Sequence, residues 1–245
     1  MIGVILAAGV GSRLRPMTND KPKCLVTTAG RPILQYQLDT YKEAGVKELV
    51  VVVGYEGQAV KEYLKHNKDF KINIIENEIY EDTNNMYSLY LAKEYVKGKP
   101  FVLNNADLSV ESRLVSEMLA DEREDLVAVD VGLFNDESMK VSTNGSGKII
   151  DISKQINKEK SVGCSIDFYK FSKDSSTIIF EEMESIIEND KNLKDWTEVA
   201  MQRLFNSQEL EFEPFDIKGM SWVEIDNYDD LALSDEIFSQ KKKSN

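Results

Sequence analysis

Short runs of β-branched residues alternate with segments of helical spacing through the first half of the chain. Four such runs, bounded by glycine or polar residues, predict strands at 3–8, 47–55, 72–77 and 100–107. Segments whose apolar residues recur at helical spacing lie among these runs, at 31–45, 57–66 and 84–96. This alternation is typical of a parallel sheet that is covered by helices on both faces.

The pattern changes after residue 132. The stretch 139–154 contains two apolar runs around Asn144-Gly145, a dipeptide that strongly favours a hairpin turn. Further strands are predicted at 125–132, 161–172, 210–217 and 220–226, and further helices at 176–190, 196–205 and 228–238. The chain has no repeat, low-complexity segment or long linker. We therefore expect one α/β domain over 1–245, with a mostly parallel Rossmann-like sheet and a smaller, mixed, β-rich part.

The net charge and the small numbers of histidine and cysteine residues exclude several kinds of binding and catalytic site. The formal net charge of −13 argues against nucleic-acid binding, and the "KKKSN" end, which we expect to be solvated, is too short to change this. His66 is the only histidine, so histidine triads and multi-histidine metal sites are excluded. With only Cys24 and Cys164, neither a disulfide framework nor a cysteine-rich zinc site is expected. The chemistry must therefore use carboxylates, lysines and arginines, with or without a metal ion bound by oxygen.

The apolar runs also bear on location. None approaches the roughly 18 residues that a membrane crossing needs. The run at the N-terminus lacks the preceding basic region of a signal peptide. We expect a cytoplasmic protein without a membrane partner.

The segment 6–26, "LAAGVGSRLRPMTNDKPKCLV", places glycines and then basic residues directly after the first predicted strand. Glycines let backbone N–H groups approach phosphate oxygens, and arginine and lysine neutralise their charge. Leu14 stands where a dinucleotide-binding turn has its third glycine, and the Gly-Lys-Ser/Thr ending of a P-loop is absent. The segment predicts a phosphate site of another kind, with a glycine turn and solvated cations as the alternative.

The same segment resembles the signature of the sugar-nucleotide and phosphocholine nucleotidylyltransferases, roughly L-A-A-G-x-G-[ST]-R-L-x-P-x-T followed by K-P-K-x-[LM]. Other segments recur in the order of that family: "GRPILQYQLDTYKEAGV", "VVVGY", "NNMYSLYLA", "NNADLSV" and "WVEIDNYDDL". Within the family, "NNMYSL" and the later segments are most similar to the phosphocholine cytidylyltransferase branch. The resemblance implies that residues 1–132 mainly bind nucleotide and residues 133–245 mainly bind the acceptor.

The resemblance implies transfer of a nucleotidyl group. An acceptor phosphate oxygen attacks the α-phosphorus of a nucleoside triphosphate, and pyrophosphate leaves. This reaction needs no general base, because a phosphomonoester has a second pKa of about 6. Lys23 and Arg13 match family residues that contact the triphosphate and the leaving pyrophosphate. Asp107 and Asp226, each at the end of a predicted strand, match the aspartates that hold Mg²⁺, which is the expected cofactor.

The resemblance also implies a set of nucleotide contacts. Residues at the end of the first strand and directly after it correspond to the backbone that frames the base and ribose: Leu6, Ala7, Ala8, Gly9 and Gly11. Asn84, Asn85 and Ser88 are expected over the base, although Asn84 has helix capping as its alternative. Likeness to the branch favours CTP, with UTP or dTTP as alternatives.

The acceptor is left more open. Lys154 stands in the place of a family lysine that contacts the acceptor phosphate, but Ser-Lys-Gln replaces the Glu-Lys-Pro of the sugar enzymes, which disfavours a hexose phosphate. Glu224 is predicted to be a second metal ligand or an acceptor contact, with packing or solvation as the alternative. With Asp167 and Glu198 it would add negative charge beside a cationic head group. Five aromatic residues are predicted either to offer ring faces to a trimethylammonium group or to pack in the core: Trp196, Trp222, Tyr87, Tyr90 and Tyr169.

The leading hypothesis is therefore an Mg²⁺-dependent cytidylyltransferase with a small, phosphocholine-like acceptor. One alternative keeps the chemistry with a sugar 1-phosphate and UTP, dTTP or GTP. A second is a nucleotide-binding module that lacks catalysis. The partners expected are small molecules only, and the oligomeric state is left open.

Overall fold

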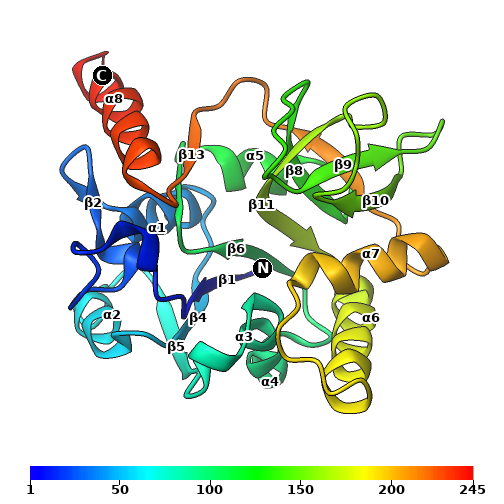
Figure 1. Ribbon diagram of the computed structural model, residues 1–245, viewed down its shortest axis with the longest axis horizontal. Coiled ribbons are helices and arrows are strands. Elements are labelled where there is room, and N and C mark those ends of the chain that lie inside the picture. The colour runs from blue at the N-terminus through cyan, green and yellow to red at the C-terminus, as the bar shows by residue number, and fades with distance from the viewer. Residues whose placement is uncertain (245) are drawn as a thin grey trace.

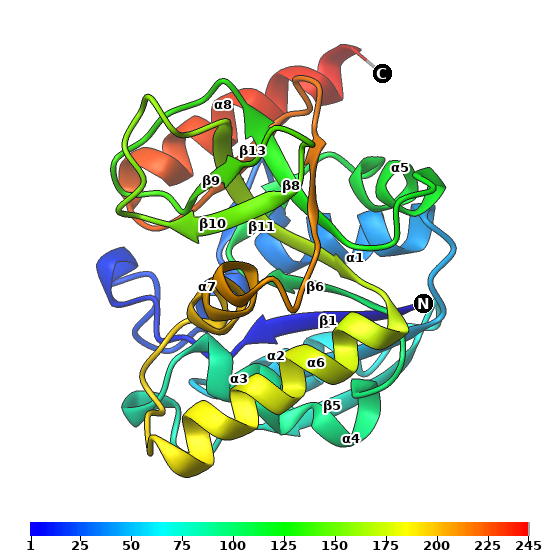
Figure 2. The same cartoon turned by 90° about the vertical axis from the view of Figure 1, so that its right-hand side faces the viewer.

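A computed structural model describes residues 1–244, with side chains for 1–240; the expected solvated "KKKSN" end lies outside the described side chains. The chain forms one nine-stranded sheet with helices on both faces, and two small two-stranded sheets (Figures 1 and 2). The strands are β1 (Ile2–Ala7), β2 (Thr27–Thr28), β3 (Arg31–Pro32), β4 (Glu48–Val53), β5 (Lys71–Glu76), β6 (Phe101–Asn105), β7 (Leu108–Val110), β8 (Leu126–Val131), β9 (Lys140–Thr143), β10 (Ile149–Ser153), β11 (Gly163–Phe171), β12 (Glu213–Asp216) and β13 (Trp222–Glu224). The helices are α1 (Ile33–Glu43), α2 (Gly57–Leu64), α3 (Asn85–Leu91), α4 (Lys93–Val96), α5 (Leu114–Ala120), α6 (Lys173–Glu184), α7 (Thr197–Ser207) and α8 (Tyr228–Ser244).

The main sheet runs β10-β9-β11-β6-β1-β4-β5, and β8 pairs with both β11 and β12. The pairs β6–β1, β1–β4 and β4–β5 are parallel, whereas β11 is antiparallel to β6, β8 and β9. The predicted α/β class with a mostly parallel first half and a mixed, β-rich second half is confirmed. Among residues 1–244, no helix combines the length and apolar character that a membrane crossing requires.

Two apolar cores lie on opposite faces of this sheet. Along β1, Ile2, Val4 and Leu6 face one core, and Ile5 and Ala7 face the other, as the alternation of side chains in a strand requires. The first core packs against α3, α4, α6 and α7, and the second packs against α1, α2 and α5. Figure 2 shows α1 and α5 on one side of β1 and β6, and α3, α4 and α6 on the other. Burial on both faces explains why the central strands are almost wholly apolar.

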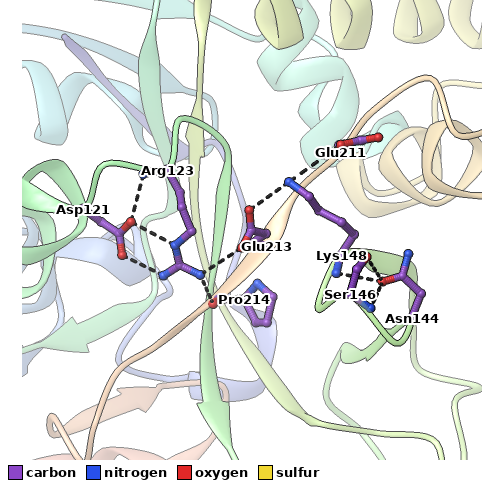
Figure 3. Close-up of polar contacts among 8 residues, drawn as sticks. All are labelled: Asp121, Arg123, Asn144, Ser146, Lys148, Glu211, Glu213 and Pro214. Carbon is purple, nitrogen blue, oxygen red and sulfur yellow. Dashed lines mark hydrogen bonds and ion pairs between the residues drawn. The ribbon is translucent and has the colours of Figure 1, made fainter.

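The predicted turn at Asn144-Gly145 is confirmed, and the residues beside it hold the edge of the sheet together (Figure 3). Asn144 Oδ1 accepts hydrogen bonds from the backbone N–H groups of Ser146 and Lys148. Lys148 Nζ then lies 2.8 Å from Glu213 Oε1, which ties the β9–β10 hairpin to β12.

Several details differ from the predicted elements. The short strands β2, β3 and β7 were not predicted, and the single helix predicted over 84–96 is α3 followed by α4. Helix α5 was not predicted, although Leu114, Val115 and Met118 are buried at helical spacing, because the segment is only seven residues long. The last strand, predicted over 220–226, ends at Glu224, because it pairs only with the three residues of β7. Asp226 therefore lies in the connection to α8, where its backbone N–H donates to Asp230 Oδ2.

Candidate active site

A cavity of about 920 Å³ opens at the carboxyl ends of β1 and β6, the edge at which ligands bind in open α/β sheets. Most of its lining comes from connections that meet there: the loop after β1, the segment before α3, the β8–β9 loop, and the residues before α7 and α8. Seventeen of the predicted site residues line it: Leu6, Ala7, Ala8, Gly9, Arg13, Lys23, Asn84, Asn85, Ser88, Asp107, Lys154, Asp167, Trp196, Glu198, Trp222, Glu224 and Asp226.

The loop after β1 is shaped so that Lys23 reaches the cavity. Gly11 has φ of +63°, and a Cβ atom on it would lie 2.7 Å from Lys23 Cβ, so only glycine fits there without strain. Thr18 Oγ1 donates to the carbonyl oxygen of Gly11 at 2.9 Å, and Leu14 is fully buried beneath the loop. Gly11 does not line the cavity, so the structure gives it a supporting position beside Lys23.

The charged centre of the cavity consists of one lysine, one arginine and two aspartates. Lys23 Nζ lies 3.0 Å from Asp107 Oδ2 and 2.6 Å from Asp226 Oδ1. Arg13 Nη2 lies 2.8 Å from Asp226 Oδ2. Burial works against the charge of Lys23, but the two carboxylates outweigh it and raise the pKa of the ammonium. The pKa of Asp226 is lowered: burial opposes this shift, and Lys23 and Arg13 overcome it.

The same aspartates form a group that fits a divalent cation. Oxygen atoms of Asp107, Glu224 and Asp226 lie within 4.8 Å of one another. Among the described residues, Asp107 Oδ1 is buried without a hydrogen-bond partner, which is costly unless a cation or donor binds there. Burial, then the charges of Asp107 and Asp226, raise the pKa of Glu224 to about 7. Hard carboxylate oxygens in this arrangement suit Mg²⁺, which also coordinates substrate phosphates.

The predicted base-facing residues also carry structural hydrogen bonds. Asn84 Oδ1 accepts from the N–H of Asn85, so Asn84 caps α3, as its alternative role predicted. Asn85 Oδ1 accepts from the N–H of Thr197 at 2.9 Å and so ties α3 to α7. Ser88 Oγ accepts from Asn77 Nδ2. All three line the cavity, but the structure does not assign any of them to a base.

Acidic groups gather at the other end of the cavity. Asp167 interrupts β11 with φ of +55°, at an irregularity of the β11–β8 pairing between Ser165 and Tyr169. Such a bulge re-aims a side chain, and Asp167 lines the cavity. The Tyr169 hydroxyl lies 2.6 Å from Glu198 Oε1 and 3.0 Å from Asp167 Oδ1. Burial raises the pKa of both carboxyls, and for Asp167 the charge of Glu198 adds to the effect.

Two tryptophans border these acids. Trp222 Nε1 donates to Asp130 Oδ2 at 2.8 Å, which fixes the indole. Lys154 Nζ lies 5.2 Å from the centroid of the Trp196 ring, so a cation of the protein already occupies one aromatic face.

The remaining predicted aromatic residues do not line the cavity. The Tyr90 hydroxyl donates to Glu188 at 2.6 Å, on the side of α3 that packs toward α6, so the structure does not bring this predicted acceptor residue to the cavity. Tyr87 packs against the first core, and Tyr169 is buried behind the two acids that it contacts. The aromatic cage expected for a trimethylammonium group is therefore reduced to Trp196 and Trp222.

Sequence reasoning missed part of the lining, including Asn77, Asn105, Asp130, Asp230 and the segment of the β8–β9 loop from Leu133 to Met139. Asn105 precedes Ala106 and Asp107 at the end of β6. A polar residue at the end of an otherwise apolar strand is a signal that could have identified it. The β8–β9 loop has no motif that signals its role, and contacts with β11 and β9 hold it at the cavity.

Comparison with known proteins identifies the class. A family model described as "Nucleotidyl transferase" matches residues 2–233. The chain belongs to this nucleotidyl transferase family, and the predicted enzyme class is confirmed.

Two relatives are cytidylyltransferases. The chain is 28% identical over 255 residues to CTP:phosphoglutamine cytidylyltransferase of Campylobacter jejuni, which covers 95% of this chain and 98% of that protein. It is 44% identical over 94 residues to choline-phosphate cytidylyltransferase of Streptococcus pneumoniae, covering 38% of this chain and 40% of that protein. The solved structure of CTP:phosphocholine cytidylyltransferase from the same organism has a TM-score of 0.77 at 24% identity, covering 97% of this chain and 99% of that one, and supports the fold.

Proposed function

We propose that this enzyme transfers CMP from CTP to a small phosphorylated acceptor that carries a cationic group, with release of pyrophosphate. The observation that carries the proposal is the cluster of Lys23, Arg13, Asp107 and Asp226 at one cavity, which combines cations for a triphosphate with carboxylates for a metal. A phosphoryl-type transfer needs such positioning and neutralisation of charge more than covalent chemistry. The absence of a histidine from the cavity lining agrees with this, because the acceptor phosphate is already ionised near neutrality.

In the proposed reaction, an acceptor phosphate oxygen forms a bond to the α-phosphorus of CTP while the bond to pyrophosphate breaks. Lys23 and Arg13 bind the charged phosphates, and binding exchanges their ion pairs with Asp107 and Asp226 for contacts with substrate. Asp107 and Asp226, with Glu224 beside them, would hold Mg²⁺. When bound, this ion neutralises charge on the triphosphate.

The preference for CTP rests on the relatives, two of which are named as cytidylyltransferases at 28% and 44% identity. The loop from Leu6 to Gly9 and the start of α3 supply the cavity wall that we assign to the nucleotide. By the same division, residues 1–132 mainly bind CTP and residues 133–245 mainly bind the acceptor, in a protein that we expect in the cytoplasm.

The acidic end of the cavity supports a cationic acceptor. Asp130, Glu137, Asp167, Glu198 and Glu224 all line it, together with the two tryptophans. Carboxylates accept hydrogen bonds, and a protonated amine has N–H groups that donate them. A lining of carboxylates therefore suits such an amine better than an aromatic cage would. Lys154 lies among them and is the cation that we assign to the acceptor phosphate.

The test is pyrophosphate release with Mg²⁺, in which CTP, UTP, dTTP, ATP and GTP are each combined with phosphocholine, phosphoethanolamine, 2-aminoethylphosphonate and glucose 1-phosphate. We expect turnover with CTP and an amine-bearing acceptor. Turnover only with glucose 1-phosphate and another nucleotide would overturn both substrates and keep the enzyme class.

A matched pair of variants tests whether the measured turnover depends on the cavity. Asp107→Asn keeps the size of the side chain but removes the charge of a predicted metal ligand, so turnover is expected to fall by about 10²-fold or more. Asp20→Asn makes the same change at an exposed residue of the loop after β1 and is expected to leave turnover unchanged. Equal activity in the two variants would remove Asp107 from the proposed site.

A further inference from the structure

Lys140 is a buried cation just outside the cavity. Its side chain begins at the start of β9 and is only 1% exposed. No carboxylate among the described residues forms an ion pair with it. A lysine buried without a carboxylate is uncommon, because its desolvation must be offset by other partners.

The partners of Lys140 are two successive carbonyl groups of the β8–β9 loop (132–139). Lys140 Nζ donates to Asn135 O at 3.1 Å and to Asp136 O at 2.9 Å, and it lies 5.3 Å from the centroid of the Phe134 ring. Hydrogen bonds from an ammonium group are about twice as strong as those between neutral groups. Lys140 therefore holds the middle of the loop from beneath.

The other contacts of this loop lie at its two ends and at Cys164 of β11. The N–H of Gly132 donates to Val162 O and the N–H of Leu133 donates to Asp130 O at the beginning of the loop, and the N–H of Ser165 donates to Met139 O at its end. The Cys164 thiol donates to Leu133 O and also interacts with the Asn135 backbone and the Ser138 side chain. The centre of the loop, at Asn135 to Glu137, is exposed. An exposed loop with few anchors depends strongly on each of them for its position.

The same loop forms one wall of the cavity. Leu133, Asn135, Glu137, Ser138 and Met139 line it, beside Ser165 and Asp167 of β11. In Figure 1 the connection between β8 and β9 lies at the upper right with β10 and β11, whereas the loop after β1, coloured dark blue, lies at the left. The wall therefore belongs to the end of the cavity that we assign to the acceptor.

We propose that Lys140 is a positioning residue for acceptor binding: it fixes the β8–β9 loop so that this loop forms the acceptor wall of the cavity. The proposal rests on the proposed function in placing the acceptor at this end. Lys140 does not line the cavity, so it acts through the loop and not by contact with substrate. The loop carries Glu137, whose charge then stands at a defined place in the acidic end.

The first test is Lys140→Met, which keeps the length of the side chain and removes the donors. The KM for the acceptor that turns over fastest in the substrate panel is expected to rise by about tenfold, with less than about a twofold change in the KM for CTP. Lys170→Met is the matched control. Lys170 is also buried, and its ammonium donates to the carbonyls of Met118, Asp121 and Arg123, outside the cavity. It is expected to lower thermal stability and to leave both KM values unchanged.

The second test does not depend on the substrate. Limited proteolysis with a glutamate-specific protease, mapped by mass spectrometry, is expected to show faster cleavage after Glu137 in Lys140→Met than in the wild type or Lys170→Met. If Lys140→Met does not fold, Lys140→Arg keeps the charge with a different donor geometry and is expected to show the same effects more weakly.

The outcomes separate the two proposals. Equal rises in both KM values, or unchanged cleavage after Glu137, would overturn the role of Lys140. Faster cleavage in a protein that turns over no acceptor of the panel would support the fixed loop and count against the proposed function.

Discussion

Lys23 Nζ lies 2.6 Å from Asp226 Oδ1, and this contact joins residues that are 203 positions apart in the chain. The same ammonium lies 3.0 Å from Asp107 Oδ2, so one cation neutralises carboxylates from two further segments. Three connections of the fold thus meet at a single nitrogen atom. Under the proposed function, a triphosphate that enters the cavity competes for this nitrogen, and Lys23 would then couple substrate binding to the chemical step.

We expect Lys23→Met to reduce kcat/KM for CTP by about 10²- to 10³-fold, because it removes a preorganised cation from the phosphates. Steady-state pyrophosphate release measures this. Lys21→Met is the control, since Lys21 is exposed two residues earlier. A comparable loss in Lys21→Met would mean that the loop binds phosphate through its overall charge and not through Lys23 itself.

The two glycines of the loop after β1 should respond differently to alanine. A Cβ atom on Gly9 meets nothing within 4 Å, and Gly9 lines the cavity, so Gly9→Ala should fold normally but raise the KM for CTP. Gly11→Ala forces φ of +63° on a residue with a Cβ atom and crowds Lys23, so it should cost about 1–2 kcal/mol of stability. Thermal unfolding and the KM for CTP distinguish the two; a destabilised Gly9→Ala with normal KM would contradict this.

Glu224 should make stability depend on pH in Mg²⁺-free buffer with EDTA. Its pKa is raised from 4.5 to about 7 by burial and by Asp107 and Asp226. The folded state holds a proton that the unfolded state has lost, so stability is lost as pH rises from 4.5 through 7. Glu224→Gln should therefore gain stability relative to the wild type, by on the order of 2 kcal/mol, between pH 4.5 and pH 8.

Chemical unfolding at several pH values provides that measurement. The exposed Glu209→Gln is the control and should show no such gain. A constant difference between Glu224→Gln and the wild type across this range would show that Glu224 is ionised throughout.

Asp121 should act in the opposite sense, at lower pH. Its carboxylate accepts two hydrogen bonds from the Arg123 guanidinium, at 2.9 and 2.7 Å, and one from the Arg123 backbone N–H at 3.0 Å. These bonds lower the pKa of Asp121 from 3.8 to about 2 (Figure 3). This stabilisation is present above pH 4 and is lost as pH falls toward 2. Asp121→Asn should cost on the order of 1 kcal/mol at pH 7, after allowance for solvent screening, and the cost should shrink below pH 4. Urea unfolding at pH 7 and pH 3 measures both values, and an equal cost at the two would rule out the ion pair as its cause.

Much of the fold was predictable because its signals are local. β-branched runs and helical spacing predicted nearly all of the strands of the main sheet and the longer helices. Where pairing with another element decides a boundary, the prediction failed: β13 stops at Glu224 because β7 offers only three partners. Helix α5 was missed because seven residues carry too little periodicity, although its apolar side chains are buried in the core beneath the sheet.

The sequence by itself determined the loop after β1, the family and the charged residues Arg13, Lys23, Asp107 and Asp226, because these depend on residue type at fixed spacing. Only the tertiary structure decided which side chains share the cavity. Tyr90 has the right chemistry for an acceptor, but its helix turns it toward Glu188. Asp167 enters the cavity through a bulge, and the β8–β9 loop forms a wall through a buried lysine. Such placements arise from strand pairing and packing between distant segments, which no local pattern encodes.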